Sequence, residues 1–149
     1  MRYTFMLVCA LMMITSCSRE SKNEYTEVED VINNAIGWAS GKDFDLLHNT
    51  LCLDSTFLEV DPTDKVIKGY KDFKSSEEFF AHPDFQAVGY EINDLYINFS
   101  ESGSVAWFYC CLNDWNTWKG QPANWENVRW TGVLEKKDGF WQIRQQHFS

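Results

Sequence analysis

The chain has 149 residues, and its 13 Lys and Arg stand against 22 Asp and Glu, which gives a formal net charge of −9 at pH 7. An acidic surface repels phosphate groups, so the composition argues against nucleic-acid binding and makes anionic lipid headgroups poor partners. The length suits one domain with a hydrophobic core and is too short for two.

The N-terminal residues are expected to form a targeting segment. Residues 1–16 carry one Arg and then an apolar run, FMLVCALMMI, which has the length of a signal-peptide core and is too short to span a bilayer. The run ends in Ile-Thr-Ser-Cys, which resembles the lipobox of bacterial lipoproteins. We therefore expect residues 1–16 to be a lipoprotein signal peptide, Cys17 to be lipidated and residues 17–26 to be a polar tether.

A lipid on Cys17 would place the protein in the bacterial cell envelope, either periplasmic or associated with the outer membrane. Acyl chains hold a protein on a bilayer through their buried CH₂ groups, so the membrane is an expected partner through the anchor alone. Ser18 differs from the aspartate that favours inner-membrane retention of such lipoproteins, which favours the outer membrane. The alternative is an ordinary secretory signal in which the cysteine has no role.

Three cysteines, Cys52, Cys110 and Cys111, lie in the expected domain over residues 27–149. An oxidising compartment would allow one disulfide, from Cys52 to either of the other two, because adjacent strand residues point to opposite faces. The alternative is that all three are buried as small apolar side chains. No Cys or His spacing indicates zinc, so we expect neither a metal nor a cofactor.

The first half of the domain is predicted to be mainly helical. Apolar residues recur at spacings of three and four from residue 27 to residue 40, Gly41 follows as a stop signal, and Asp43 is a candidate N-cap. The predicted elements are helices over residues 27–40, 44–52 and 70–81 and a short hairpin over residues 57–60 and 66–67.

The second half is predicted to consist of strands. Residues 85–99 alternate in polarity, and the almost continuous apolar run over residues 104–113 indicates a central strand buried on both faces. Residues 114–123 are expected to form a loop whose Trp115 and Trp118 either stack on a ligand or clip the loop to its own sheet. Helices followed by antiparallel strands predict an α+β fold in which a curved sheet wraps a helical layer.

The last 22 residues give the clearest local pattern, because Asp138-Gly139 between two apolar runs is a strong hairpin-turn signal. The predicted register pairs Lys136 with Phe140, Val133 with Ile143, Thr131 with Gln145 and Arg129 with His147. One face of this hairpin would then change from apolar near the turn to polar at the far end, which suits the mouth of a pocket. The alternative is an ordinary half-exposed sheet with polar residues where it meets water.

The order of these elements, with RWT at residues 129–131, GFWQI at 139–143 and HFS at the end, resembles the SnoaL-like domains of the nuclear-transport-factor-2-like (NTF2-like) superfamily. The match covers residues 27–149. The resemblance implies an α+β cone in which three N-terminal helices pack on a strongly curved, mixed but mostly antiparallel sheet and enclose a cavity. It also implies a possible homodimer through the outer face of the sheet.

The resemblance implies a pocket but no particular reaction, because the superfamily includes isomerases, cyclases, dehydratases, an epoxide hydrolase and non-catalytic modules. No motif assigns Asp54, Asp94 or Asp114 to the carboxylates that such isomerases use. The first hypothesis is a lipid-anchored protein that binds a small, largely apolar molecule. The second is an interaction or assembly module, and the third is an enzyme of the isomerase, cyclase or hydrolase type that uses His147 with Arg129.

The candidate ligand-binding residues are Arg129, Thr131, Gln145, His147, Trp141, Trp107 and Tyr109. An imidazole can transfer a proton near neutral pH, and a guanidinium can bind a carboxylate or an oxyanion, so the third hypothesis makes His147 and Arg129 the catalytic candidates. The aromatic residues are included because seven Trp cannot all fit one small core. The alternative is that Arg129 pairs with Glu59 or Glu126 and that His147 is structural.

Overall fold

The computed structural model describes residues 23–149, so the expected signal peptide and Cys17 lie outside the described residues. The described chain begins in a helix over residues 23–41. The other elements are helices α2 (Phe44–Thr50), α3 (Tyr70–Lys74) and α4 (Glu77–Ala81) and strands β1 (Leu58–Val60), β2 (Val66–Lys68), β3 (Phe85–Phe99), β4 (Val105–Trp118), β5 (Gln121–Pro122), β6 (Trp125–Lys137) and β7 (Phe140–Phe148).

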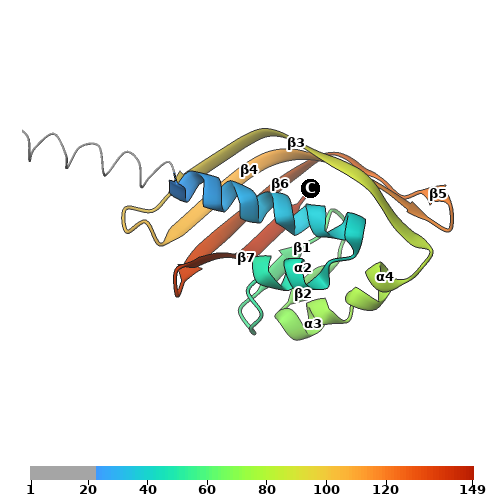
Figure 1. Cartoon of the computed structure of the whole chain (residues 1–149), viewed down its shortest axis with the longest axis horizontal. Helices are drawn as coiled ribbons and strands as arrows, with labels where there is room; N and C mark the ends of the chain where they lie inside the picture. The colour runs from blue at the N-terminus through green and yellow to red at the C-terminus, as the bar shows by residue number, and fades with distance from the viewer. Residues whose placement is uncertain (1–22) are drawn as a thin grey trace, which may run out of the picture.

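The strands form one mixed sheet in the order β2-β1-β7-β6-β4-β3, and β5 pairs with β4. The pair β1 and β7 is parallel, whereas the other strand pairs are antiparallel. The sheet is strongly curved, and the helix over residues 23–41 crosses its concave face (Figure 1). The predicted α+β cone, with N-terminal helices on a curved, mostly antiparallel sheet, is confirmed.

The helix over residues 23–41 packs on the sheet through one face, on which Val28, Ile32, Ala35 and Trp38 are buried. Their spacings of four and three residues are those that place side chains on one side of a helix. The helix continues through Gly41, where a stop was expected, and the next residue, Lys42, leaves it with a left-handed φ of +52°.

Two local predictions about the helices have different outcomes. Asp43 caps α2 as predicted, because its carboxylate accepts a hydrogen bond of 2.9 Å from the backbone N–H of Leu46. The predicted third helix is interrupted at Ser75 and Ser76, and its two parts are α3 and α4. The Ser75 hydroxyl donates to the Asp72 carbonyl at 2.6 Å, so a local side-chain bond competes there with the helical ladder.

Residues 23–26 were expected to belong to the tether, but they are helical. Glu24 explains why, because one carboxylate oxygen accepts a hydrogen bond of 2.8 Å from Trp141 Nε1 and the other pairs with Lys136 Nζ at 2.5 Å. These contacts lower the pKa of Glu24, the hydrogen bond from Lys136 most of all. The start of the described helix is thereby held at the turn end of the β6–β7 hairpin.

The loop expected over residues 114–123 is instead a continuation of the sheet. Strand β4 runs on to Trp118, and Lys119 and Gly120 turn the chain with φ values of +51° and +73° before β5 pairs back onto β4. Two left-handed residues in a row make the turn that suits the twist of a hairpin. Trp118 stacks on Phe79 of α4 with ring centroids 4.7 Å apart, so it ties the hairpin to the helical layer.

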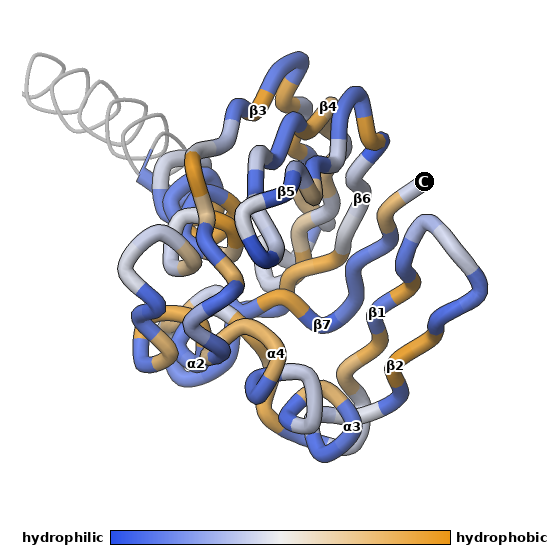
Figure 2. Tube along the Cα trace, turned by 90° about the vertical axis from the view of Figure 1, so that its right-hand side faces the viewer, coloured by the Kyte–Doolittle hydropathy of each residue, from blue (hydrophilic) through white to orange (hydrophobic). Residues whose placement is uncertain are grey.

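Strand β4 is an interior strand between β6 and β3, but it lies second from the edge of the sheet and is buried on one face only. Ala106, Phe108, Cys110 and Leu112 are buried, whereas Trp107 is 44% exposed and Tyr109 is 39% exposed. The apolar run misled the prediction because both faces carry large side chains, and no described element covers the outer one. Figure 2 shows orange hydrophobic and blue hydrophilic segments alternating along β1, β2 and β7, the pattern of a sheet buried on one face.

The three domain cysteines are free thiols. Cys52 and Cys110 are buried and Cys111 is half-buried. Cys52 and Cys110 therefore pack as small apolar side chains, the alternative to a disulfide. Burial raises the pKa of the Cys110 thiol to about 12, which keeps it protonated and unreactive.

Candidate functional site

The predicted register of the β6–β7 hairpin is wrong. Asp138 and Gly139 form a two-residue turn with φ values of +53° and +86°, so Phe140 pairs with Lys137 and not with Lys136. A β-bulge at Arg144 then shifts the pairing by one further residue. The observed partners are Leu134 with Ile143, Val133 with Gln145, Thr131 with His147 and Arg129 with Ser149.

The bulge also decides which side chains of β7 face inward. Trp141 and Ile143 are buried on the concave side before it, and Gln146 and Phe148 are buried there after it. The extra residue at Arg144 therefore exchanges the two faces along the strand.

The residues expected to line the pocket mouth consequently lie on the outer face of the sheet. That face carries Arg129, Thr131, Gln145, His147, Trp107 and Tyr109 in paired rows. Neither Glu59 nor Glu126 pairs with Arg129 in the described part of the chain. Trp141 does face inward, but it contacts Phe99 and Glu24. The six residues of the outer face therefore do not line the concave side of the sheet, and their role in ligand binding stays a prediction, for a ligand at the outer face.

A cavity of about 690 Å³ lies on the concave side, between the sheet and the helical layer. Its wall is mainly apolar and aromatic and is formed by Ala35, Ile36, Trp38, Ala39, Leu47, Phe73, Phe79, Phe80, Phe85, Ala123, Trp125 and Phe148. Its polar lining residues are Glu59, Asp61, Lys65, Ser75, Ser76, Asp114, Asn116 and Gln146. A volume of this size with a few polar groups is typical of a small-molecule site.

Glu59 and Gln146 form the first polar pair in this cavity. They are direct neighbours on the parallel strands β1 and β7, and they are 7% and 6% exposed. Gln146 Nε2 donates to Glu59 Oε2, while Gln146 Oε1 is buried and has no partner among the described residues. Burial raises the pKa of Glu59 to about 7, a shift that Asp61 reinforces and that the bond from Gln146 and the charge of Lys65 oppose.

Asp114 and Asn116 form a second pair of the same kind on β4. Asn116 Nδ2 donates to Asp114 Oδ2 at 2.8 Å. Asn116 is 7% exposed, and its Oδ1 is buried without a partner among the described residues. Burial raises the pKa of Asp114, and the bond from Asn116 opposes that shift. In both pairs, therefore, the carboxyl group accepts a hydrogen bond from the amide N–H, and the amide oxygen has no donor among the described residues.

The cavity has little positive charge to balance these carboxyl groups. Lys65 Nζ lies 3.6 Å from Asp61 Oδ2, and within residues 23–149 neither Glu59 nor Asp114 has a cationic partner. A carboxyl group whose pKa is near neutral can bind or release a proton at physiological pH. Across the same residues, no three His, Cys, Asp or Glu side chains gather in a way that could hold a metal ion.

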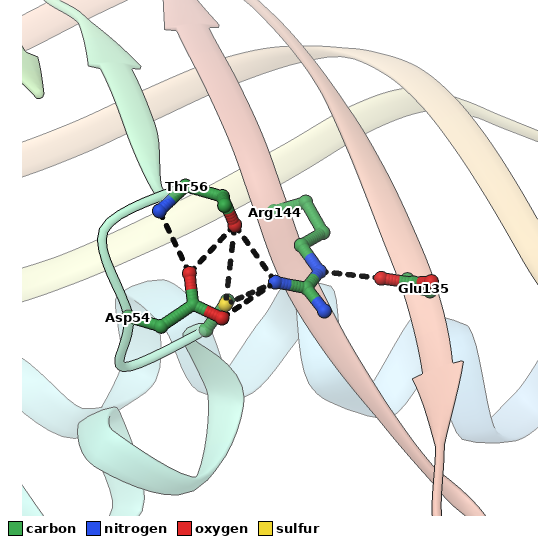
Figure 3. Close-up of polar contacts among 5 residues, drawn as sticks. Asp54, Thr56, Glu135 and Arg144 are labelled. Atoms are coloured by element: carbon green, nitrogen blue, oxygen red, sulfur yellow. Dashed lines mark hydrogen bonds and ion pairs between the residues drawn. The ribbon is translucent and has the colours of Figure 1, made fainter. Parts of the chain in front are cut away.

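A separate polar cluster on the opposite side of β7 is structural. Arg144 Nη1 donates to Asp54 Oδ2 at 2.9 Å, to Thr56 Oγ1 at 2.8 Å and to Cys52 Sγ at 2.7 Å, while its Nε donates to Glu135 at 2.5 Å (Figure 3). Hydrogen bonds from Thr56 hold the pKa of Asp54 well below its usual range. Arg144 thus clamps the loop before β1 to the bulge that turns Gln146 inward.

Comparison with known proteins places this fold. Residues 28–149 match the protein family described as SnoaL-like domain. No protein of curated function matches the chain.

Three solved structures illustrate the similarity. An NTF2-like superfamily protein from Salmonella enterica has a TM-score of 0.73 at 15% identity, with 87% of this chain and 92% of that one covered. A proposed scytalone dehydratase from Novosphingobium aromaticivorans has a TM-score of 0.73 at 10% identity, with coverage of 88% and 86%. A proposed Ca/calmodulin-dependent kinase II association domain from Exiguobacterium sibiricum has 0.69 at 10%, with coverage of 84% and 91%. At these identities the likeness establishes the fold alone.

Proposed function

The chain belongs to the SnoaL-like domain family, and from that premise we propose that it binds a small, largely apolar molecule in its cavity, held in the bacterial cell envelope by a lipid on Cys17. The observation that carries the proposal is the cavity of about 690 Å³ with its mainly apolar and aromatic wall. Such a wall binds a ligand by removing its apolar surface from water, at roughly 25 cal/mol per Å².

The position of the helix over residues 23–41 agrees with an anchor on Cys17. Glu24 is held at the turn end of the β6–β7 hairpin. α4, which lines the cavity through Phe79 and Phe80, and β5 lie at the other end of the molecule (Figure 1). Only a few residues separate Cys17 from Glu24. An anchored domain would therefore keep its β5 and α4 end away from the membrane. Within the described residues, no helix is both long and apolar enough to cross a bilayer.

Filling the cavity tests this proposal. Ala39 lines the cavity, whereas Ser40 is exposed on the same helix, so Ala39→Leu and Ser40→Leu add apolar volume inside and outside it respectively. We expect apolar probes such as hexanol to raise the Tm of the wild type and of Ser40→Leu but not of Ala39→Leu, because bound ligand stabilises only the folded state. Mass spectrometry of the purified protein would identify any retained molecule. The proposal fails if no apolar probe raises the Tm, or if Ala39→Leu responds like the wild type.

An assembly role through the outer sheet face is the second candidate, and exposed aromatic side chains favour it. Tyr96 is 60% exposed and lies opposite Tyr109 on the neighbouring strand, with Trp107 beside them. Contiguous exposed aromatics commonly mark an interaction surface. If the protein is a homodimer through this face, Trp107→Lys should give a monomer in light scattering. Phe140→Lys, which alters an exposed aromatic at the hairpin turn, should leave the dimer intact, and a wild type that is monomeric at all concentrations would exclude this role for the patch.

A further inference from the structure

Two buried amide oxygens in the cavity lack a hydrogen-bond donor. Gln146 and Asn116 are both more than nine-tenths buried, and Gln146 Oε1 and Asn116 Oδ1 have no partner among the described residues. Leaving a buried acceptor unpaired is unfavourable, so most such groups in folded proteins do have partners. A ligand that donates hydrogen bonds would provide the missing partners.

The charges beside these oxygens point to the same kind of ligand. The carboxyl groups of Glu59 and Asp114 line the cavity, and Lys65, its one lysine, is paired with Asp61. A buried carboxylate without a cation is strongly disfavoured. The polar groups around Glu59 are therefore mostly acceptors. Gln146 Nε2 is the donor that Glu59 has, Gln146 Oε1 has none, and no cation forms an ion pair with Glu59 among the described residues.

A primary ammonium group meets both requirements. It carries a positive charge, three N–H donors and no acceptor, so it can bond to the Glu59 carboxylate and to Gln146 Oε1 together. A hydroxyl group supplies one donor and no charge, and a carboxylate supplies neither. We propose that the cavity binds a primary amine with an apolar body, the ammonium group at Glu59 and Gln146 and the body along the aromatic wall. This inference rests on the proposed ligand-binding function and adds the chemical class of the ligand.

The sheet register favours Glu59 over Asp114 as the ammonium site. Across the sheet, Gln146 pairs with Gly132 and Gly132 with Phe108, whereas Asp114 lies six residues further along β4. At about 3.3 Å per residue this separates the two pairs by up to ~20 Å along the strand, less on a curved sheet, so one ammonium group cannot serve both. Glu59 is the more deeply buried carboxyl group and therefore gains more from a cation.

The groups that face Glu59 also predict how binding depends on pH. Asp61 on β1's outgoing turn, Lys65 across that turn and the neutral Gln146 on β7 surround it. Because burial raises the pKa of Glu59 to about 7, the carboxylate forms as the pH rises through neutrality, while an alkylamine stays protonated. Affinity for the amine should therefore increase from pH 6 to pH 8.

Calorimetric titration of the full chain with hexylamine, hexanol and hexanoate tests the proposal, because the three probes share one apolar body. We expect hexylamine to bind about tenfold or more tightly than hexanol at pH 8, and hexanoate to bind most weakly. Glu59→Gln should weaken hexylamine about ten- to hundredfold and leave hexanol within about threefold, since one charge-assisted contact is lost. The new glutamine oxygen can still accept from Gln146, so the fold should persist.

Asp64→Asn is the matched control, because it makes the same charge change at an exposed turn residue outside the cavity wall. It should leave hexylamine affinity within about threefold. Equal binding of all three probes would overturn the amine proposal while leaving the proposed apolar site intact, whereas binding of none would overturn both. A larger loss of hexylamine affinity in Asp114→Asn than in Glu59→Gln would overturn the assignment to Glu59.

Discussion

The two faces of the curved sheet use the same strands differently. On the concave face of β6, Trp130 is 0% exposed and belongs to the core, whereas Trp107 on the convex face of the neighbouring strand is open to solvent. The concave face also holds the two carboxyl–amide pairs, and the convex face carries the polar row with Arg129 and His147. In this protein the role of a strand residue therefore depends on whether its position is odd or even, which decides the face it lies on. The single bulge residue Arg144 exchanges the two faces along β7.

The largest expected difference between the faces is in side-chain truncation. Trp130→Ala should lower the free energy of unfolding by about 3–5 kcal/mol, because it removes a fully buried ring that packs against Phe108 and Phe148. Trp107→Ala should cost less than about 1 kcal/mol, since much of that ring is already in water. Urea denaturation compares them, and an equal loss at Trp107 would mean that the convex face is covered in solution.

The buried carboxyl group gives the next largest effect, and it depends on pH. The pKa of Glu59 is raised from its usual 4.5 to about 7, so the folded protein holds a proton that the unfolded chain has released between these values. Stability from this group is therefore lost as the pH rises from about 4.5 to 7. Glu59→Gln should unfold less readily than the wild type at pH 8, by up to about 3 kcal/mol, and equally at pH 4.

Urea denaturation at these two pH values measures the difference, and Asp64→Asn, at an exposed position, controls for net charge. A Glu59→Gln variant that is no more stable than the wild type at pH 8 would show that the carboxylate finds compensation in the folded protein.

Adding a methyl group where the strands lie close together on the concave face should have a smaller effect on the free energy of unfolding. A Cβ at Gly132 would lie 2.4 Å from the Phe108 ring and 2.8 Å from the Gln145 carbonyl oxygen, so Gly132→Ala should destabilise by about 2 kcal/mol. At Gly41 a Cβ meets nothing within 4 Å, so Gly41→Ala should be neutral or slightly stabilising. Thermal unfolding distinguishes the two, and similar Tm values would mean that the strands separate easily around Gly132.

The smallest effect is expected on the convex polar row. His147→Ala should change the free energy of unfolding by less than about 0.5 kcal/mol and leave hexanol affinity unchanged, because His147 faces away from the cavity. The neighbouring Gln146→Ala, on the cavity side, should weaken cavity binding of hexylamine. Loss of binding in His147→Ala alone would return the ligand site to the convex face and restore the hypothesis that His147 acts with Arg129.

Much of the fold could be predicted because local patterns and global arrangement agree. The apolar spacing around Val28 and Ile32 predicts the helix that crosses the sheet, Asp43 predicts the start of α2, and Asp138-Gly139 predicts the hairpin turn. The candidate site could not be predicted in this way. Glu59, Asn116 and Gln146 are isolated polar residues in strands, and no spacing distinguishes them from solvent-exposed ones.

One signal in the sequence could have located Gln146. Beyond Phe140, which adjoins the turn, the apolar residues of the last strand stand at 141, 143 and 148, so they change from odd to even positions between Ile143 and Phe148. A regular strand buried on one face cannot produce that change, whereas a bulge can. Reading the change as a bulge would have turned Gln146 inward and Gln145 and His147 outward.

The sequence by itself determined the α+β class, the order of the elements, most helix faces and the hairpin turn, because these depend on short-range periodicity and turn chemistry. It also supplied the expectation of a lipid anchor at Cys17, which lies outside the described residues. Only the tertiary structure decided the pairing of Glu59 with Gln146 and the contact of Arg144 with Asp54. Those contacts join residues about 90 positions apart, which meet only when the parallel strand β1 closes the sheet against β7.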